Sequence, residues 1–322
     1  MIYTGSNTTV EINIKADLNA WAYEMLTKAG FENTLPERAL YQYCNLKLRL
    51  LAPKPRKVKI SKEFIVSEDC QNGYEYFKAA VERGDNLIPF MSKKIVDVES
   101  KDKMIYDWGM FHFHLGTEKD TNDPRFIKRA DHLLIAFVDE NHDDNMYFLQ
   151  VRPHISDIWT EQDLVRILAD NWPDIMEPYR IQGFISLTEN ISDADYKEMR
   201  KNNVNTFVDL HDGRVYVGAN HGLNTAGTSV KAVSQYDYYC NNANLFEKWM
   251  GESTDSIGKA INQKLLTPEK EFQLKMIAPG DRDYLFEVVD HGFLLRFVLK
   301  DKKGIIVVGD NREQIDEKLK DL

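Results

Sequence analysis

The chain has 322 residues, of which 43% are hydrophobic and 29% are charged, with 17 glycines and 10 prolines. This composition excludes a disordered, collagenous or coiled-coil chain and fits about two domains of ordinary size. The formal net charge of −10 excludes capture of nucleic acid by a generally basic surface, so any such contact has to be local.

The cysteines and the apolar segments indicate the compartment. Cys44, Cys70 and Cys240 form no CxxC pair, which favours neither a disulfide framework nor a thiolate zinc site. The first residues show no basic segment followed by an apolar one, and no apolar stretch approaches the roughly 20 residues that cross a bilayer. We therefore expect a cytoplasmic protein that does not bind membranes.

Helical spacing of apolar residues predicts three helices in the first 85 residues. The first covers residues 18–29 behind a capping Asp17, and the second covers residues 36–51. The third runs over Gln71–Arg83 and ends at Gly84, a residue type common just past a helix end.

The apolar period then changes to two, which predicts strands at residues 105–115, 130–138 and 146–151. The last two form an antiparallel hairpin. A helix follows from Thr160 and Asp163 to Asn171, and we place the end of a first domain at residue 175.

Residues 176–322 repeat the mixture of helices and strands. The expected elements are a helix at 193–201, a hairpin turning at Asp212-Gly213, a polar loop at 218–229, a long helix through Phe246 and Trp249, strands near 272–277, 283–289, 293–299 and 305–308, and a final helix. The predicted fold class is α+β. Amino-terminal helices pack on a mostly antiparallel sheet in residues 1–175, and a second α+β domain follows in residues 176–322.

Five of the eight histidines lie between positions 112 and 154. Strand alternation places His112 and His114 on one face of their strand. Arg129 and Asp131 share a face at the next strand, and His154 follows the third strand. These five residues form the candidate catalytic set.

Metal-free RNA cleavage requires a base for the 2′-hydroxyl, an acid for the leaving 5′-oxygen and a cation for the charge on phosphorus. Two histidines and an arginine meet these requirements without a cofactor. In this hypothesis Arg129 binds the phosphate, and Asp131 orients an imidazole or Arg129 itself. His114 and His154 exchange the acid and base roles, and RNA is bound at this local site.

Two other interpretations use the same residues. His112, His114, Asp131 and His154 can supply nitrogen and oxygen ligands to Zn²⁺ or Mn²⁺, although no HExxH motif accompanies them. The histidines can also belong to a half-buried sheet without a chemical role.

The polar loop at residues 218–229 is a candidate anion site, because free N–H groups at the start of a helix bind anions. It lacks the GxxxxGK[ST] and GxGxxG motifs, so a helix start capped by Ser or Thr is the competing interpretation. The candidate residues are His221, Asn224, Thr225, Thr228 and Ser229.

The segments HFHLG, RADHLLIAFVD and MYFLQVRPH resemble the strand, arginine, hairpin and histidine order of the RelE/ParE-like superfamily of small bacterial toxins. The resemblance covers residues 15–160. It implies a helical pair ahead of an antiparallel sheet and cleavage of mRNA by a few basic or polar side chains. Arg129 would be the phosphate-binding arginine and His154 the terminal acid or base. Family members are short and usually basic, whereas this chain is long and acidic.

The predicted function is a metal-independent, endoribonuclease-like toxin or phage-defence effector, whose carboxy-terminal domain serves regulation or partner binding. One alternative is a non-catalytic recognition protein, antitoxin-like or encoded by a phage, whose acidic surface binds a basic protein partner. The other alternative is a metal-dependent hydrolase that uses the His and Asp side chains.

Overall fold

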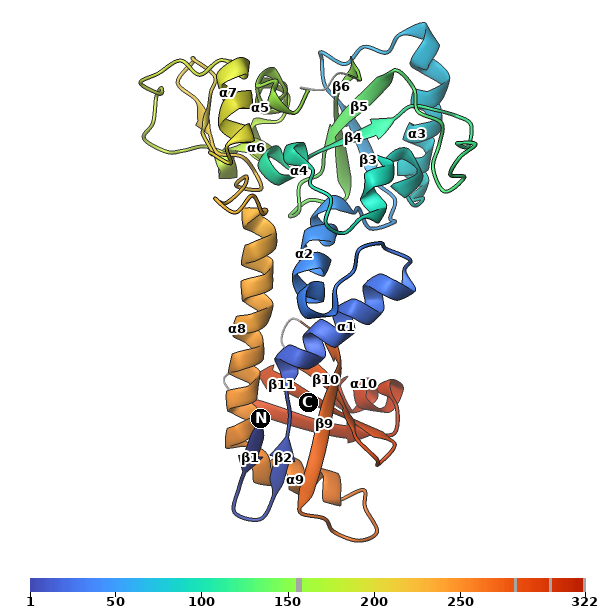
Figure 1. Cartoon of the computed structure of the whole chain (residues 1–322), viewed down its shortest axis with the longest axis vertical. Helices are drawn as coiled ribbons and strands as arrows, with labels where there is room; N and C mark the ends of the chain where they lie inside the picture. Colours follow the sequence, from blue (N-terminus) through green and yellow to red (C-terminus); the bar gives the residue numbers. More distant parts are fainter. Residues whose placement is uncertain (155–157, 281–282, 301–302, 321–322) are drawn as a thin grey trace. The chain divides into compact units, whose positions relative to one another are not determined.

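The computed structural model describes residues 1–154, 158–280, 283–300 and 303–320, and these form an α+β fold (Figure 1). The chain splits into two compact units. Unit 1 combines residues 1–43 with residues 235–322, and unit 2 comprises residues 44–234. No helix in the described ranges is both long enough and apolar enough to cross a membrane.

Unit 1 is built on a mixed sheet that joins the two ends of the sequence. Its strand order is β1-β2-β9-β10-β11-β12, and β2 runs parallel to β9 while the other neighbours are antiparallel. The strands are β1 (Ile2–Thr4), β2 (Thr9–Glu11), β9 (Glu271–Pro279), β10 (Asp283–Val288), β11 (Phe293–Lys300) and β12 (Lys303–Gly309).

Helices α1 and α8 pack against this sheet, with Leu18 of α1 and Phe246 of α8 in one core with residues of β9, β10 and β11. Ile315 of α10 belongs to a smaller core with Leu285 and Val307. The helices of this unit are α1 (Ile14–Lys28), α2 (Ala39–Arg49), α8 (Val230–Glu252), α9 (Thr254–Asn262) and α10 (Arg312–Lys320). Helix α2 extends across residue 43, and α8 extends across residue 234.

The compact units do not follow the predicted boundary at residue 175. Thr9 in β2 lies opposite Glu271 in β9, so the amino-terminal segment folds with the carboxy-terminal sheet. As a consequence, α1 lies in unit 1, while the hairpin that the sequence predicts beside it lies in unit 2.

Unit 2 contains a second mixed sheet in the order β3-β6-β5-β4, in which β3 and β6 are parallel. The antiparallel pairing of β5 with β6 confirms the hairpin predicted in residues 130–151. The strands are β3 (Lys57–Ile60), β4 (Met110–His114), β5 (His132–Phe137), β6 (Asn145–Pro153), β7 (Val208–Asp209) and β8 (Val215–Tyr216), and the last two pair apart from this sheet.

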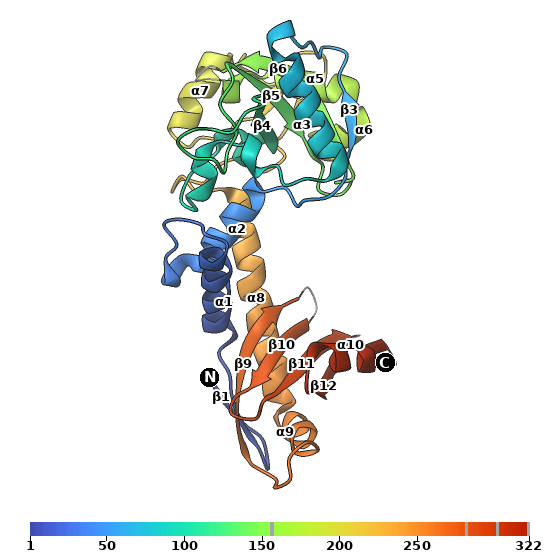
Figure 2. The same cartoon turned by 90° about the vertical axis from the view of Figure 1, so that its right-hand side faces the viewer.

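The two faces of this sheet have different neighbours. The ring of Phe77 in α3 lies 4.6 Å from the ring of Phe113 in β4, so α3 covers one face (Figure 2). On the other side, Leu133 and Ile135 of β5 share a core with α5. The helices are α3 (Gln71–Arg83), α4 (Lys103–Trp108), α5 (Asp163–Asn171), α6 (Pro173–Met176) and α7 (Asp193–Lys201). Short 3-10 segments are η1 (Pro36–Arg38), η2 (Glu68–Cys70), η3 (Ile88–Phe90), η4 (Lys93–Val96), η5 (Ile158–Thr160) and η6 (Glu177–Tyr179).

Two local predictions are wrong. Residues 105–108 are helical instead of extended, because the Asp102 side chain accepts a hydrogen bond from the Ile105 N–H and Gly109, with φ of 68°, ends α4 before β4 begins. Asp17 does not cap α1. Asn13 caps it instead, and Asp17 accepts a hydrogen bond from the Met276 N–H.

Candidate active site

A cavity of about 530 Å³ lies in unit 2, over the face of the sheet that carries His114 and Leu133. These two residues lie opposite each other in the register of β4 and β5. The described lining residues come from the end of α2, from residues 91–105, and from strand β4 with Arg129 and Leu133. His154, Ile158 and Trp159 complete them. The cavity therefore gathers side chains that are far apart in the sequence.

Four of the five predicted catalytic residues line this cavity, namely His112, His114, Arg129 and His154. Asp131 is not among its described lining residues, and the Asp131 side chain is exposed. The Asp131 carbonyl oxygen accepts a hydrogen bond of 2.7 Å from the His154 N–H, which fixes the chain where it leaves β6. Asp131 thus positions His154 through the backbone.

His114 is the buried member of the histidine cluster, with 2% of its surface exposed. Burial, together with nearby His112, Arg129 and His154, lowers the pKa of His114 to about 3. Its Nδ1 atom is inaccessible to solvent and has no hydrogen-bond partner among the residues that the structure describes. His114 is therefore a neutral imidazole at neutral pH, which disfavours the predicted exchange of acid and base roles between His114 and His154.

His112 and His154 keep contact with solvent and can exchange protons with a substrate. The Nδ1 atom of His112 lies 3.7 Å from Oδ2 of Asp102. Asp102 is held in place because its other carboxylate oxygen caps α4. The carboxylate beside an imidazole of this cavity is therefore that of Asp102, whereas Asp131 is not among the described lining residues.

The cavity is basic although the protein is acidic. Among its described lining residues, one carboxylate, that of Asp102, faces the cations of Arg49, Lys94, Lys101, Lys103 and Arg129. Burial lowers the pKa of Lys103, as do the charges of Arg200, Lys101 and Lys201. The Lys103 ammonium lies 4.7 Å from the centre of the Trp159 ring.

Sequence reasoning missed the four cations other than Arg129. A signal was present, because three of them lie in a short segment with Lys at positions 94, 101 and 103. Residues 93–96 form η4, and Lys103 begins α4, so short helical turns bring these lysines to the cavity.

The predicted metal ligands do not come together. Within the described residues, no three of the ligand atoms of His112, His114, Asp131 and His154 lie within 4.8 Å of one another. The cavity therefore offers this set no compact coordination sphere.

The loop at residues 218–229 uses its polar groups internally. Asn224 accepts a hydrogen bond from the Thr228 N–H through its side chain, and Ser229 accepts one from the Ala232 N–H. The Val230 N–H donates to the Gly222 carbonyl, and Ser229 is fully buried. These contacts match the competing interpretation of a helix start capped by serine. The N–H groups named here already donate hydrogen bonds within the protein, so they are not available to bind an anion.

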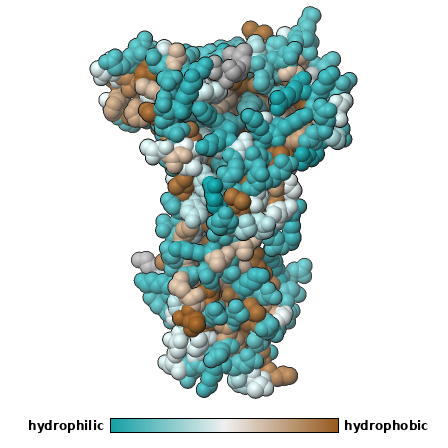
Figure 3. Space-filling model, viewed as in Figure 1, coloured by the Kyte–Doolittle hydropathy of each residue, from teal (hydrophilic) through white to brown (hydrophobic). Residues whose placement is uncertain are grey.

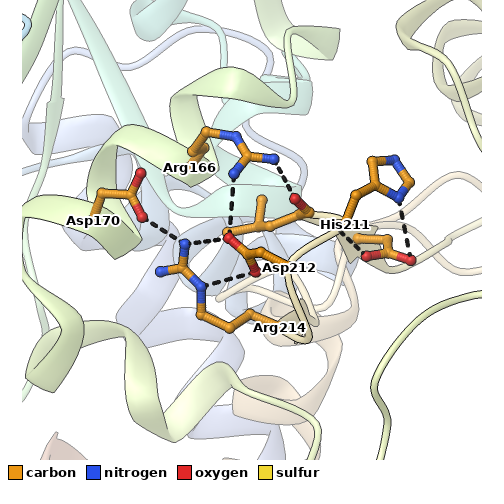
Figure 4. Close-up of polar contacts among 7 residues, drawn as sticks. Arg166, Asp170, His211, Asp212 and Arg214 are labelled. Atoms are coloured by element: carbon orange, nitrogen blue, oxygen red, sulfur yellow. Dashed lines mark hydrogen bonds and ion pairs between the residues drawn. The ribbon is translucent and has the colours of Figure 1, made fainter.

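A further polar cluster fixes the β7–β8 hairpin to α5 (Figure 4). Arg214 contacts Asp170 of α5 and Asp212 of the turn, each at 2.6 Å. Arg166 of α5 also contacts Asp212, at 3.3 Å. Because the carboxylates are paired with arginines of the same unit, this cluster has a structural role.

The sequence matches no protein family model, and neither a curated protein nor a solved structure is similar to the chain. The assignment of function rests on the geometry and charge of the cavity.

Proposed function

We propose that unit 2 is a cytoplasmic, metal-independent endoribonuclease that binds and cleaves RNA in the basic cavity. The observation that carries this proposal is the cluster of five cations around two accessible imidazoles in a protein whose net charge is −10. A local concentration of positive charge in an acidic protein favours a polyanionic ligand at that place.

In this mechanism Arg129 and the neighbouring lysines bind the scissile phosphate. His112, oriented by Asp102, takes the proton of the 2′-hydroxyl, and the 2′-oxygen attacks phosphorus. The bond from phosphorus to the 5′-oxygen breaks, and His154 protonates that oxygen. The products are a 2′,3′-cyclic phosphate and a free 5′-hydroxyl.

His114 has a supporting role in this mechanism. Its neutral ring is stacked on that of His154, with 5.5 Å between the ring centroids. Because the ring is neutral, it adds no positive charge to a cavity that already holds several cations. The resemblance to RelE/ParE-like toxins assigns phosphate binding to Arg129 and proton transfer to His154, and both residues line the cavity. In a bacterial cell such an activity would act as a toxin or as a phage-defence effector.

The test is cleavage of a fluorescently labelled single-stranded RNA in the presence of EDTA. We expect the full chain to cleave it, and we expect His154→Gln and Arg129→Gln each to lose about 100-fold or more in rate. His142→Gln is the matched control, because His142 is 65% exposed and is not among the described residues that line the cavity.

Three outcomes contradict the proposal. These are equal cleavage by all variants, no cleavage by the wild-type chain, and loss of wild-type cleavage in EDTA with rescue by Mn²⁺. The last outcome would favour the metal-dependent hydrolase. Growth arrest on expression of the wild-type chain, relieved by His154→Gln, would support the proposed role as a toxin.

A second candidate function is protein recognition, favoured by apolar side chains at the surface of unit 2. Phe184, Ile185 and Phe207 are 49%, 77% and 38% exposed, and the rings of the two phenylalanines lie 6.5 Å apart. Figure 3 shows separate hydrophobic patches on a largely hydrophilic face of the molecule. If this surface binds a protein partner, Ile185→Asp should abolish its capture without changing RNA cleavage.

A further inference from the structure

Three side chains with different metal-binding atoms lie together at the start of α3. Asp69 and Cys70 come from η2, and His132 is the first residue of β5. Their ligand atoms all lie within 4.8 Å of one another. Leu133 lines the cavity, so strand alternation directs His132 to the opposite face, where α3 packs. This cluster is thus separate from the proposed catalytic cavity.

Two of the three distances within the cluster approach those of a tetrahedral metal centre. Oδ2 of Asp69 lies 3.8 Å from Nδ1 of His132 and 3.7 Å from Sγ of Cys70. Ligands bound to Zn²⁺ at about 2.0–2.3 Å in a tetrahedron lie about 3.3–3.7 Å from one another. The two distances from Asp69 are therefore within a few tenths of an ångström of this spacing, while the ligand atoms of Cys70 and His132, which lie within 4.8 Å of each other, would approach by up to about 1 Å on binding.

An unpartnered atom provides a second, independent indication. Nδ1 of His132 is inaccessible to solvent and, within the described part of the chain, has no hydrogen-bond partner. A buried ring nitrogen without a partner is unfavourable, and it is the atom that faces the Asp69 carboxylate. A cation between these atoms would satisfy both.

The local charge also favours a cation. The Cys70 thiol forms no disulfide and is almost fully buried, and the negative charges of Asp69 and Asp131 act on it. The exposed Asp131 carboxylate therefore adds negative charge near this cluster. A bound divalent cation would offset the carboxylates and stabilise the thiolate form of Cys70.

We propose that Asp69, Cys70 and His132 bind a Zn²⁺ ion that links the start of α3 to β5. A sulfur, a nitrogen and a carboxylate oxygen are the donors that Zn²⁺ accepts, whereas Mg²⁺ and Ca²⁺ select oxygen ligands alone. Water completes the fourth position. The proposal is independent of the RNA cleavage proposed above, because the two sites use different residues on opposite faces of the sheet.

The test is equilibrium dialysis of the chelator-stripped full chain against micromolar Zn²⁺, with the bound metal measured by atomic emission. We expect one Zn²⁺ per wild-type chain. Cys70→Ser and His132→Gln should each weaken binding by about 100-fold or more, because the loss of an outer partner alone costs about 10–100-fold. Cys240→Ser and His142→Gln are matched controls, and both should bind like the wild type.

Substitution with Co²⁺ gives a second readout. The wild-type chain should show a thiolate-to-cobalt charge-transfer band that Cys70→Ser lacks, and circular dichroism verifies that each variant is folded. His132→Gln keeps the proposal testable if Cys70→Ser fails to fold. Failure of the wild type to bind Zn²⁺, or equal binding by folded Cys70→Ser and His132→Gln, would overturn the proposal. Neither outcome depends on whether the protein cleaves RNA.

Discussion

The imidazole rings of His114 and His154 lie nearly parallel, with 5.5 Å between ring centroids and 15° between ring planes. The two rings differ in environment, because His114 is buried and His154 is exposed. A buried neutral ring therefore supports an exposed ring that can exchange protons. In the proposed mechanism, this difference assigns proton transfer to His154 and a positioning role to His114.

The burial of His114 predicts a specific dependence of stability on pH. Its pKa is about 3 in the folded chain, below the unfolded value of about 6.5, so the unfolded state binds more protons between these values. The stabilisation by neutral His114 is thus complete above pH 6.5 and is lost as the pH falls toward 3. Between about pH 7 and about pH 4, the free energy of unfolding of the wild type should fall by on the order of a few kcal/mol more than that of His114→Gln.

Urea unfolding at a series of pH values measures this difference. His221→Asn is the control, because His221 is exposed and its left-handed backbone suits asparagine, and its unfolding should follow the wild-type pH dependence. Parallel pH curves for the wild type and His114→Gln would show that the folded pKa of His114 is not depressed.

Arg129 is expected to contribute one phosphate contact to RNA binding. Removing one such contact should reduce the slope of log affinity against log salt concentration by about 0.7 for a single strand. Fluorescence anisotropy with labelled RNA at several salt concentrations measures this slope for the wild type and Arg129→Gln. Arg125→Gln is the control, because the Arg125 guanidinium pairs with Asp123 and is not among the described lining residues. An unchanged slope for Arg129→Gln would place the phosphate elsewhere.

Helices and strands were predictable from the sequence where residues close together in the chain determine them. The helix Gln71–Arg83 and its end at Gly84 appear as expected, since apolar spacing and a glycine with φ of 80° specify both. The unit boundary was not predictable, because it depends on the pairing of Thr9 with Glu271. Apolar periodicity contains no information about a contact between residues so distant in sequence.

The same distinction applies to the candidate site. Alternation along one strand correctly places His112 and His114 in the same cavity. The sequence predicts that Asp131 orients an imidazole or Arg129, whereas the carboxylate that lies beside His112 is that of Asp102, from a different segment. Which carboxylate approaches an imidazole depends on how α4 packs, and that is a tertiary property.

A buried ion pair between Arg200 and Asp107 should be important for the stability of unit 2. Both side chains are almost fully buried, and the Tyr196 hydroxyl donates a 2.7 Å hydrogen bond to Asp107. Burial lowers the pKa of Arg200 to about 10, so it still carries its charge at neutral pH. Arg200→Met leaves the buried Asp107 charge without its partner, and it should lower the free energy of unfolding by about 3–5 kcal/mol.

Urea unfolding followed by tryptophan fluorescence tests this expectation. The double variant Asp107→Asn with Arg200→Met removes both charges and should recover part of the lost stability. A cost of less than about 1 kcal/mol for Arg200→Met would indicate that the pair is solvated, as surface ion pairs are.

Gly73 permits the close approach of α3 to the end of β4. A Cβ atom at this position would lie 1.7 Å from the carbonyl oxygen of Leu115, which is backbone and cannot rotate away. Gly73→Ala should gain up to about 1 kcal/mol of stability from the higher helix propensity of alanine. Overpacking typically lowers stability by about 1–3 kcal/mol, and the cost is larger where the added atom meets rigid backbone. We therefore expect Gly73→Ala to destabilise the protein by about 2 kcal/mol or more.

Asn72→Ala, at the exposed neighbouring position, should change stability by less than about 0.5 kcal/mol. If Gly73→Ala is instead as stable as the wild type in thermal unfolding, α3 does not contact β4 as closely as the structure describes.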